Sequence, residues 1–242
     1  MNVLFEMLNE LNYATEQQFS FEFTFDDKVE RVVATPFVST EFPSQAYIIV
    51  EVRNSKLNVV NSDFYKMLAI AFRKLDFHES DMDKNTTLVI SSVRDNAEAL
   101  NSAYKVSIED NPYYFKKYVF SYMKASEKHA VEYLTSKKEN YGNPFSYKDV
   151  VLSYLLEAEY FSKYKESKDD YSAYAYFMEL ATKIPAFPLK IATSSQIKTV
   201  NQFLKENMNE DSIVKLDKFL DKEIDFKTDS IESIIDKYKS IV

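Results

Sequence analysis

The sequence predicts an α+β protein, with a small mixed or antiparallel sheet and helices in its N-terminal half and only helices in its C-terminal half. Phenylalanine occupies every second position of residues 19–25, the period of a strand with one buried face. Residues 46–52 form an almost unbroken apolar run, typical of a strand covered on both faces. From residue 111 onward, apolar residues recur at helical spacing.

The N-terminal elements follow from local periodicity and turn chemistry. Apolar residues at helical spacing predict a short amphipathic helix over residues 4–11. Residues 26–28 are expected to turn the chain, so that residues 29–34 return beside the phenylalanine strand as a hairpin. Pro36 and Pro43 then bracket an expected loop.

The next segment reads as strand, helix and strand. Residues 46–52 are expected to be the centre of the sheet, and Ser62 is a candidate N-cap for the helix that follows. Residues 76–85 are polar and read as a loop before a strand at residues 86–93. The apolar positions of the helix are Phe64, Met67, Leu68, Ala71, Phe72 and Leu75.

The second half is predicted to be helical. Asn111 and Pro112 suit the cap and first position of a long helix, and Ser146 with Asp149 forms a capping box for another. We expect a boundary near Asp110, which divides the chain into domains 1–110 and 111–242. The first helix would carry a stripe of Phe115, Tyr118, Val119, Tyr122 and Met123, and further helices are expected at 171–183, 195–206, 212–221 and 229–242.

Composition excludes several classes of enzyme. The chain has 242 residues, no cysteine, two histidines and one glycine, Gly142. Phosphate-binding loops need glycine, so no Walker loop or dinucleotide fingerprint is present. The net charge of −8 argues against broad affinity for nucleic acid. The absence of cysteine and of a long apolar run predicts a cytoplasmic protein without a membrane span.

One pattern suggests catalysis. Metal-dependent nucleases of the restriction-enzyme type place an acid and a lysine two residues apart at the end of a buried strand, and Glu51 and Arg53 occupy such positions. Arginine stands where lysine is usual, and a charge pair at a strand end is commoner than a nuclease site. The upstream acid of the site would be Asp26, Asp27, Glu30 or Glu41.

Two further clusters have simple structural interpretations. An acidic stretch between a helix and a strand offers His78, Glu79, Asp81 and Asp83 to a metal, although solvated loops of this composition are more common. His129 is expected on a helix surface. Tyrosines next to lysines could stack nucleic-acid bases, but a helical core or an interface is favoured: Tyr113, Tyr114, Tyr118, Tyr122 and Tyr154 beside Lys116, Lys117 and Lys124.

Three stretches together resemble the middle components of bacterial ABC-type three-component conflict systems, and more narrowly the accessory subunit of Lamassu-type defence. They are FP leading to YIIVEV at residues 42–52, the helix at 64–75, and IEDNPYYFKKYV at 108–119. The resemblance implies a non-enzymatic adaptor between an SMC/Rad50-like ATPase and an effector nuclease, in defence against phage or plasmids. It implies no catalytic, cofactor or metal residues, and contact with DNA only through the complex.

Two other functions stay open at this stage: a degenerate metal-dependent nuclease centred on Glu51, and a regulatory binding protein that acts alone. The last predicted helix is a candidate docking element, because one face is apolar and needs a partner surface. Packing on the chain's own helices is the equal alternative. The apolar face comprises Ile231, Ile234, Ile235, Tyr238 and Ile241.

Overall fold

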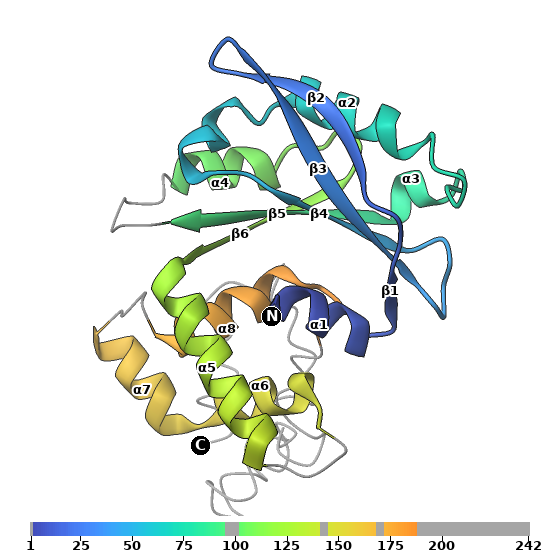
Figure 1. Ribbon diagram of the computed structural model, residues 1–242. Coiled ribbons are helices and arrows are strands. Elements are labelled where there is room, and N and C mark those ends of the chain that lie inside the picture. Colours follow the sequence, from blue (N-terminus) through green and yellow to red (C-terminus); the bar gives the residue numbers. More distant parts are fainter. Residues whose placement is uncertain (1, 95–101, 141–144, 168–171, 188–242) are drawn as a thin grey trace, which may run out of the picture. The chain divides into compact units, whose positions relative to one another are not determined.

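A computed structural model describes residues 2–94, 102–140, 145–167 and 172–187, all within one compact unit of residues 1–189. Figure 1 shows a mixed sheet with helices on both faces, which confirms the α+β prediction. The strands are β1 (Tyr13–Thr15), β2 (Phe19–Phe25), β3 (Lys28–Ser39), β4 (Ala46–Glu51), β5 (Thr86–Arg94) and β6 (Lys116–Met123). The helices are α1 (Val3–Glu10), the 3-10 helix η1 (Asn54–Val59), α2 (Ser62–Phe72), α3 (Met82–Asn85), α4 (Ser102–Glu109), α5 (Lys124–Asn140), α6 (Tyr147–Leu156), α7 (Ala158–Ser167) and α8 (Ala173–Lys183).

The sheet has an antiparallel half and a parallel half. Its strand order is β1, β3, β4, β5, β6, and β2 pairs with β3 beside β1. Strands β1, β2 and β4 run antiparallel to β3, whereas β4, β5 and β6 run parallel to one another. Parallel neighbours need crossover connections, which η1, α2 and α3 provide before β5 and α4 provides before β6. Strand β4 lies between the two halves, as the apolar run predicted.

Strand β3 continues through the loop that the sequence predicted after Pro36. One edge of β3 pairs with β2 up to Ala34 and with β1 from Phe37 onward. Pro36 falls between these two pairings, where its missing N–H removes no ladder bond to either strand. A proline is therefore tolerated inside a long strand, and the loop prediction was wrong for residues 36–39.

Each face of the sheet has its own hydrophobic core. One core joins β2, β3, β4 and β5 to α2 and the end of α4. The other joins β4, β5 and β6 to α1, α5, α6 and α8. Strand β4 supplies both, because Ile48 and Val50 face the first core and Tyr47 and Ile49 the second. The period-2 alternation of a strand buried on both faces explains its continuous apolar sequence.

The β2 to β3 hairpin forms as predicted, but its turn has two residues rather than three, because Lys28 already pairs with Phe25. The four phenylalanines of β2 all pack against the α2 side, where Phe21 and Phe25 are buried and Phe19 and Phe23 partly buried. The ring of Phe64 lies at their centre, with its centroid 5.3 Å from that of Phe21. The turn residues Asp26 and Asp27 both have positive φ, at 47° and 63°, as two-residue hairpins require.

The long helix expected from residue 112 was wrong. Residues 116–123 form β6, and a helix begins only at Lys124. The apolar positions of this stretch fit a helical stripe, but almost every residue from Lys117 to Met123 is buried, so the stretch serves as a strand covered on both faces. Helices α4 and α7 were not predicted.

Helix caps follow local sequence rules with one shift. Ser146 caps α6 by accepting from the Asp149 amide, as predicted. Helix α2 is capped by Asn61, one residue before the predicted Ser62, because the amide oxygen of Asn61 accepts from the Asp63 and Phe64 amides.

The outer edge of β6 is closed by an ion-pair clamp. The Glu109 carboxylate accepts from the Val119 amide at 2.9 Å and from the Lys183 ammonium at 2.7 Å. Lys105 reaches across in the other direction to pair with Glu179. The clamp joins α4 to α8 around the edge of the sheet. Strand β6 belongs to the sheet because it pairs with β5, although it lies beyond the boundary expected near residue 110. The division into 1–110 and 111–242 stays a prediction.

Replacing Phe21 with alanine should lower the free energy of unfolding by about 3 to 5 kcal/mol, because the ring is buried against Phe64 and its loss leaves a cavity. Thr24→Ala, on the exposed face of the same strand, is the control and should change stability by less than about 0.5 kcal/mol. Urea denaturation of both variants measures this. Equal stability of the two variants would mean that the phenylalanine face is not part of the core.

Candidate functional site

A cleft lies where β3 separates from β4. We call it the fork cleft, and its volume is about 420 Å³. Strand β4 pairs with β3 only from Ala34 to Val38, so the first half of β3 rises with β2 away from the ends of β4 and β5 (Figure 1). The lining residues are Asn2, Phe5, Gln18, Phe25, Glu30, Arg31, Val32, Val33, Thr35, Ile49, Glu51, Val52, Arg53 and Lys56.

Two charged residues of the fork cleft neutralise each other, whereas its two arginines form no ion pair with any described residue. Lys56 of η1 forms an ion pair with Glu30, and its ammonium lies 5.0 Å from the centroid of the Phe25 ring. Arg31 donates through Nε to the Ser20 hydroxyl at 2.9 Å. Neither Arg31 nor Arg53 makes an ion pair with any residue that the structure describes.

The fork cleft brings only part of the predicted nuclease site together. Among the four candidate upstream acids, Glu30 lines the cleft with Glu51 and Arg53. Alternation along the strands turns Glu30 with Val32 toward the α2 side, whereas Glu51 follows Ile49 toward the opposite face.

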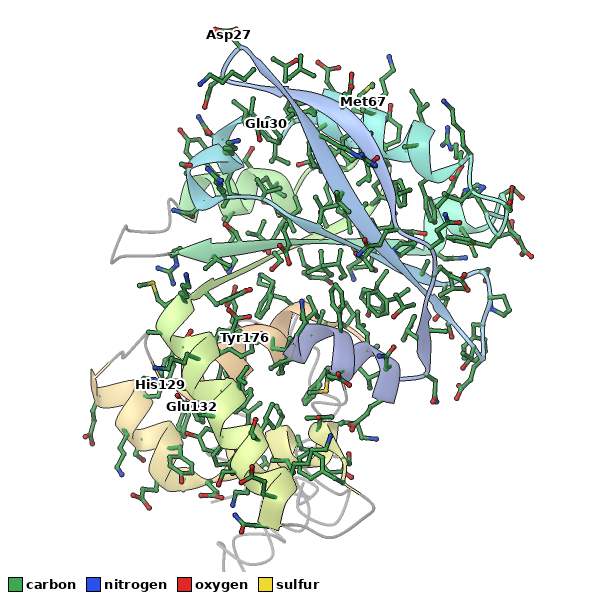
Figure 2. All side chains as sticks on the ribbon, in the orientation of Figure 1. Asp27, Glu30, Met67, His129, Glu132 and Tyr176 are labelled. Atoms are coloured by element: carbon green, nitrogen blue, oxygen red, sulfur yellow. The ribbon has the colours of Figure 1, made fainter. Side chains whose placement is uncertain are left out.

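The other candidate acids are placed elsewhere. Asp27 lies at the tip of the hairpin, away from Glu30 (Figure 2), and Asp26 precedes it in the same turn. Glu41 accepts from the Asn12 side chain at 2.7 Å and does not line the cleft. No three histidine, aspartate or glutamate side chains in the described ranges are grouped as metal ligands would be.

Glu51 instead faces a second carboxylate at the carboxyl ends of the parallel strands. Burial, and next the charge of Glu51, raise the pKa of the Glu127 carboxyl. Burial also raises the pKa of Tyr122 to about 12, and its hydroxyl lies 3.5 Å from Glu127. The charges of Glu51 and Glu127 thus repel each other at this end of the sheet, and Lys124 partly offsets the effect on Glu127.

The acidic stretch after α2 forms a surface ion pair. Asp83 accepts from Arg73 and from the His78 ring at 3.1 and 3.0 Å. Burial raises the pKa of the Asp83 carboxyl, but the hydrogen bonds and charges of Arg73 and His78 outweigh it and hold this pKa below its usual value. Glu79 and Asp81 are exposed. His129 lies on the exposed surface of α5 near Glu132, as expected (Figure 2).

Two of the five tyrosines near the lysines belong to the core, and Tyr118 is half-buried. Tyr122 and Tyr154 are buried, and Tyr154 stacks on Tyr160 with ring centroids 4.2 Å apart. The core interpretation is therefore confirmed for these two. Tyr113 and Tyr114 are 61% and 41% exposed and form a separate surface turn.

Lys117, one of the lysines beside the tyrosines in the sequence, is buried. Its exposed fraction is 2%, and its ammonium donates to the carbonyl oxygens of Tyr113 and Phe115, both at 2.6 Å. The Tyr65 ring lies below it, 4.7 Å away, and no carboxylate in the described chain pairs with it. Burial lowers the pKa of Lys117 to about 8 and raises the pKa of Tyr65 to about 12.

The buried Lys117 predicts a rise in stability with pH. Its pKa is about 8 in the folded chain and 10.5 ordinarily, so the unfolded chain binds more protons between these values and the free energy of unfolding increases there. The full difference between the two pKa values corresponds to about 3 kcal/mol of unfolding free energy. The measurement stops at about pH 10, so that tyrosine ionisation does not contribute, and should show the part of the increase that lies below that pH. Lys117→Met should abolish the increase, and exposed Lys116→Met should retain it. A flat profile in the unmodified chain would contradict the prediction.

Sequence analysis did not identify Arg31 or Lys56 as site residues. A usable signal was present, because the chain has only four arginines, and Arg31 lies in the predicted hairpin while Arg53 directly follows the predicted central strand, which pairs with β3. The apolar stripe of the last predicted helix, from Ile231 to Ile241, lies outside the described residues and stays a prediction. Within the described ranges, no helix has both the length and the apolar character needed to span a membrane.

Comparison with known proteins gives one match. Residues 45–141 match the model of the family described as ABC-three component (ABC-3C) system Middle Component 1. No curated protein and no solved structure gives a significant match. The matched residues run from β4 to α5 and contain the parallel half of the sheet with both crossover connections. About two fifths of the chain is thus similar to the middle component of an ABC-three component system.

Proposed function

We propose that the chain is a middle component of an ABC-three component system and works there as a non-enzymatic adaptor. Its partners would be an SMC/Rad50-like ATPase and an effector nuclease, in a Lamassu-type complex that acts against phage or plasmids. The observation that carries the proposal is the match of residues 45–141 to the middle-component family. A middle component works with other components, so binding to proteins is the activity expected of it.

The fold is consistent with this role. The matched segment contains β4, β5 and β6 together with the helices that connect them, so the family-like part is a structural unit rather than an isolated motif. The fork cleft lies at the edge of that unit and carries unpaired arginines, which suits recognition of a partner. Contact with DNA would then occur through the other components of the complex.

The competing function is a metal-dependent nuclease centred on Glu51. Its support is the position of Glu51 and Arg53 at the end of a buried strand, in the fork cleft. Two features weigh against it: Glu30 and Glu51 lie on opposite faces of the sheet, and the acid whose pKa the charge of Glu51 raises is Glu127 of α5.

Purified protein should not cleave plasmid DNA with Mg²⁺ or Mn²⁺, because the acids of the fork cleft do not form a metal-binding set. It should not hydrolyse ATP either, since the single glycine is incompatible with a phosphate-binding loop. Gel electrophoresis and phosphate release measure the two activities. DNA cleavage that is lost in Glu51→Ala, and retained in Glu41→Ala, would overturn the proposal in favour of the nuclease.

Co-expression with the products of the neighbouring genes should yield a complex that elutes together on size-exclusion chromatography. A chain truncated after Lys227 should keep its melting temperature and lose one partner, if the stripe from Ile231 to Ile241 docks on another subunit. Truncated protein that binds every partner with full affinity excludes this stripe as a docking element. Failure of the full chain to associate with any component contradicts the adaptor role and favours a regulatory protein that acts alone.

A further inference from the structure

We propose that the fork cleft binds an extended acidic segment of a partner protein, which adds to β3 as a further strand. The site for this segment is the edge of β3 from residue 28 to residue 33 that faces the cleft. The inference rests on the adaptor role proposed above and specifies the chemistry of the segment that the adaptor receives.

The backbone of β3 leaves part of one strand edge unpaired among the described strands. Residues 28–34 pair with β2 along one edge of the strand, and β4 pairs with the other edge only from Ala34 onward. None of the described strands lies beside that edge from residue 28 to residue 33. An open edge of about six residues offers alternating N–H and C=O groups over roughly 20 Å, which is the length that strand addition commonly uses.

The side chains beside this edge combine exposed valines with an arginine. On the face of the hairpin opposite the phenylalanines, Val29 and Val33 are 66% and 48% exposed, and Arg31 lies between them. Side chains of an added strand would stand directly opposite these three. Apolar residues opposite the two valines and an acid opposite Arg31 therefore make the best match. Because only every second residue of an added strand lies on this face, the matching sequence is apolar, any residue, acidic, any residue, apolar.

The side chains that line the cleft carry a small excess of positive charge. Lys56 and Glu30 neutralise each other, and Glu51 is the remaining acid against Arg31 and Arg53. Half of the four arginines of a chain with net charge −8 thus lie in one cleft. A guanidinium group binds a carboxylate with two parallel hydrogen bonds, so this local excess of arginine favours an acidic segment over a basic one.

The opposite edge of the sheet shows that the chain closes an edge elsewhere. At β6, the Glu109 carboxylate accepts from the edge amide of Val119 and is itself held by Lys183. Open strand edges promote unwanted pairing, and proteins commonly cover or charge them. Strand β3 has no comparable cover on its cleft edge among the described residues. A phosphodiester chain would also suit two arginines, but it would make no use of the free backbone edge or the valines.

The direct test uses fluorescein-labelled peptides of about eight residues in which valine and glutamate take turns at every second position and threonine fills the positions between them. Fluorescence anisotropy with the full chain should show binding. Arg31→Glu combined with Arg53→Glu should raise Kd about tenfold or more, because each of these exposed side chains loses a carboxylate partner. The control, Lys66→Glu combined with Lys74→Glu, makes the same change in charge on α2 and just beyond its end and should leave Kd within about twofold.

Two further probes separate strand addition from simple charge attraction. The same peptide with an N-methyl group at every residue cannot donate backbone hydrogen bonds to β3 and should not bind, and a peptide with lysine in place of glutamate should not bind either. Equal binding of the N-methylated peptide overturns the proposal. So does failure of the valine and glutamate peptide to bind, or tighter binding of a single-stranded oligonucleotide that depends on Arg31 and Arg53, which would assign the cleft to nucleic acid.

The complex provides a test that distinguishes this inference from the adaptor role itself. If the proposal is correct, the variant with both arginines replaced loses one component on co-expression, while the lysine control variant keeps all of them. If both variants assemble fully, the adaptor role stands and the fork cleft is not its docking site. If the unmodified chain assembles with no component, the adaptor role is wrong, and the peptide measurements alone decide whether the cleft binds an extended acidic segment.

Discussion

Strand β3 has twelve residues and β4 has six, and this difference in length determines where the sheet opens. The long strand must find partners along its whole length, which it does by pairing with β2 and then with β1 on one edge. On its other edge, β4 covers only the second half. The hairpin consequently leaves the body of the sheet, and the fork cleft forms at the point of separation. The position of Pro36 between the pairings with β2 and β1 makes this arrangement possible.

The outer edge of β6 and the cleft edge of β3 differ in whether they are covered. At β6, carboxylates from α4 and α8 lie against the edge, and each is neutralised by a lysine from the other helix. Removing such an acceptor would leave a partly buried amide unsatisfied, at a cost of about 1 to 3 kcal/mol. At β3, the nearest charged pair, Lys56 with Glu30, lies to one side of the cleft and leaves the strand edge free. This contrast is the reason to propose the fork cleft as a recognition site.

Elements that a local pattern determines were predicted correctly, whereas features that depend on tertiary context were missed. The alternation in β2, the double-faced apolar run of β4 and the Ser146 cap are each readable within about ten residues. Strand β6 was missed because Phe115, Tyr118, Val119 and Tyr122 fit a helical stripe as well as a strand buried on both faces. The burial of Lys117 and the approach of Arg31 to Arg53 depend on pairing between distant segments, so a single sequence does not display them.

The fork cleft also lies at the limit of the family-like part of the chain. Glu51, Arg53 and Lys56 belong to the segment that matches the middle-component family, whereas Arg31 and Val33 belong to the hairpin that precedes it. The parallel half of the sheet derives its stability from its own two cores, to which the exposed face of the hairpin contributes nothing. Substitutions on that face could therefore change which segment docks without weakening the sheet. If the fork cleft is a docking site, the hairpin supplies its specificity and the family-like segment supplies the fixed wall against which a partner binds.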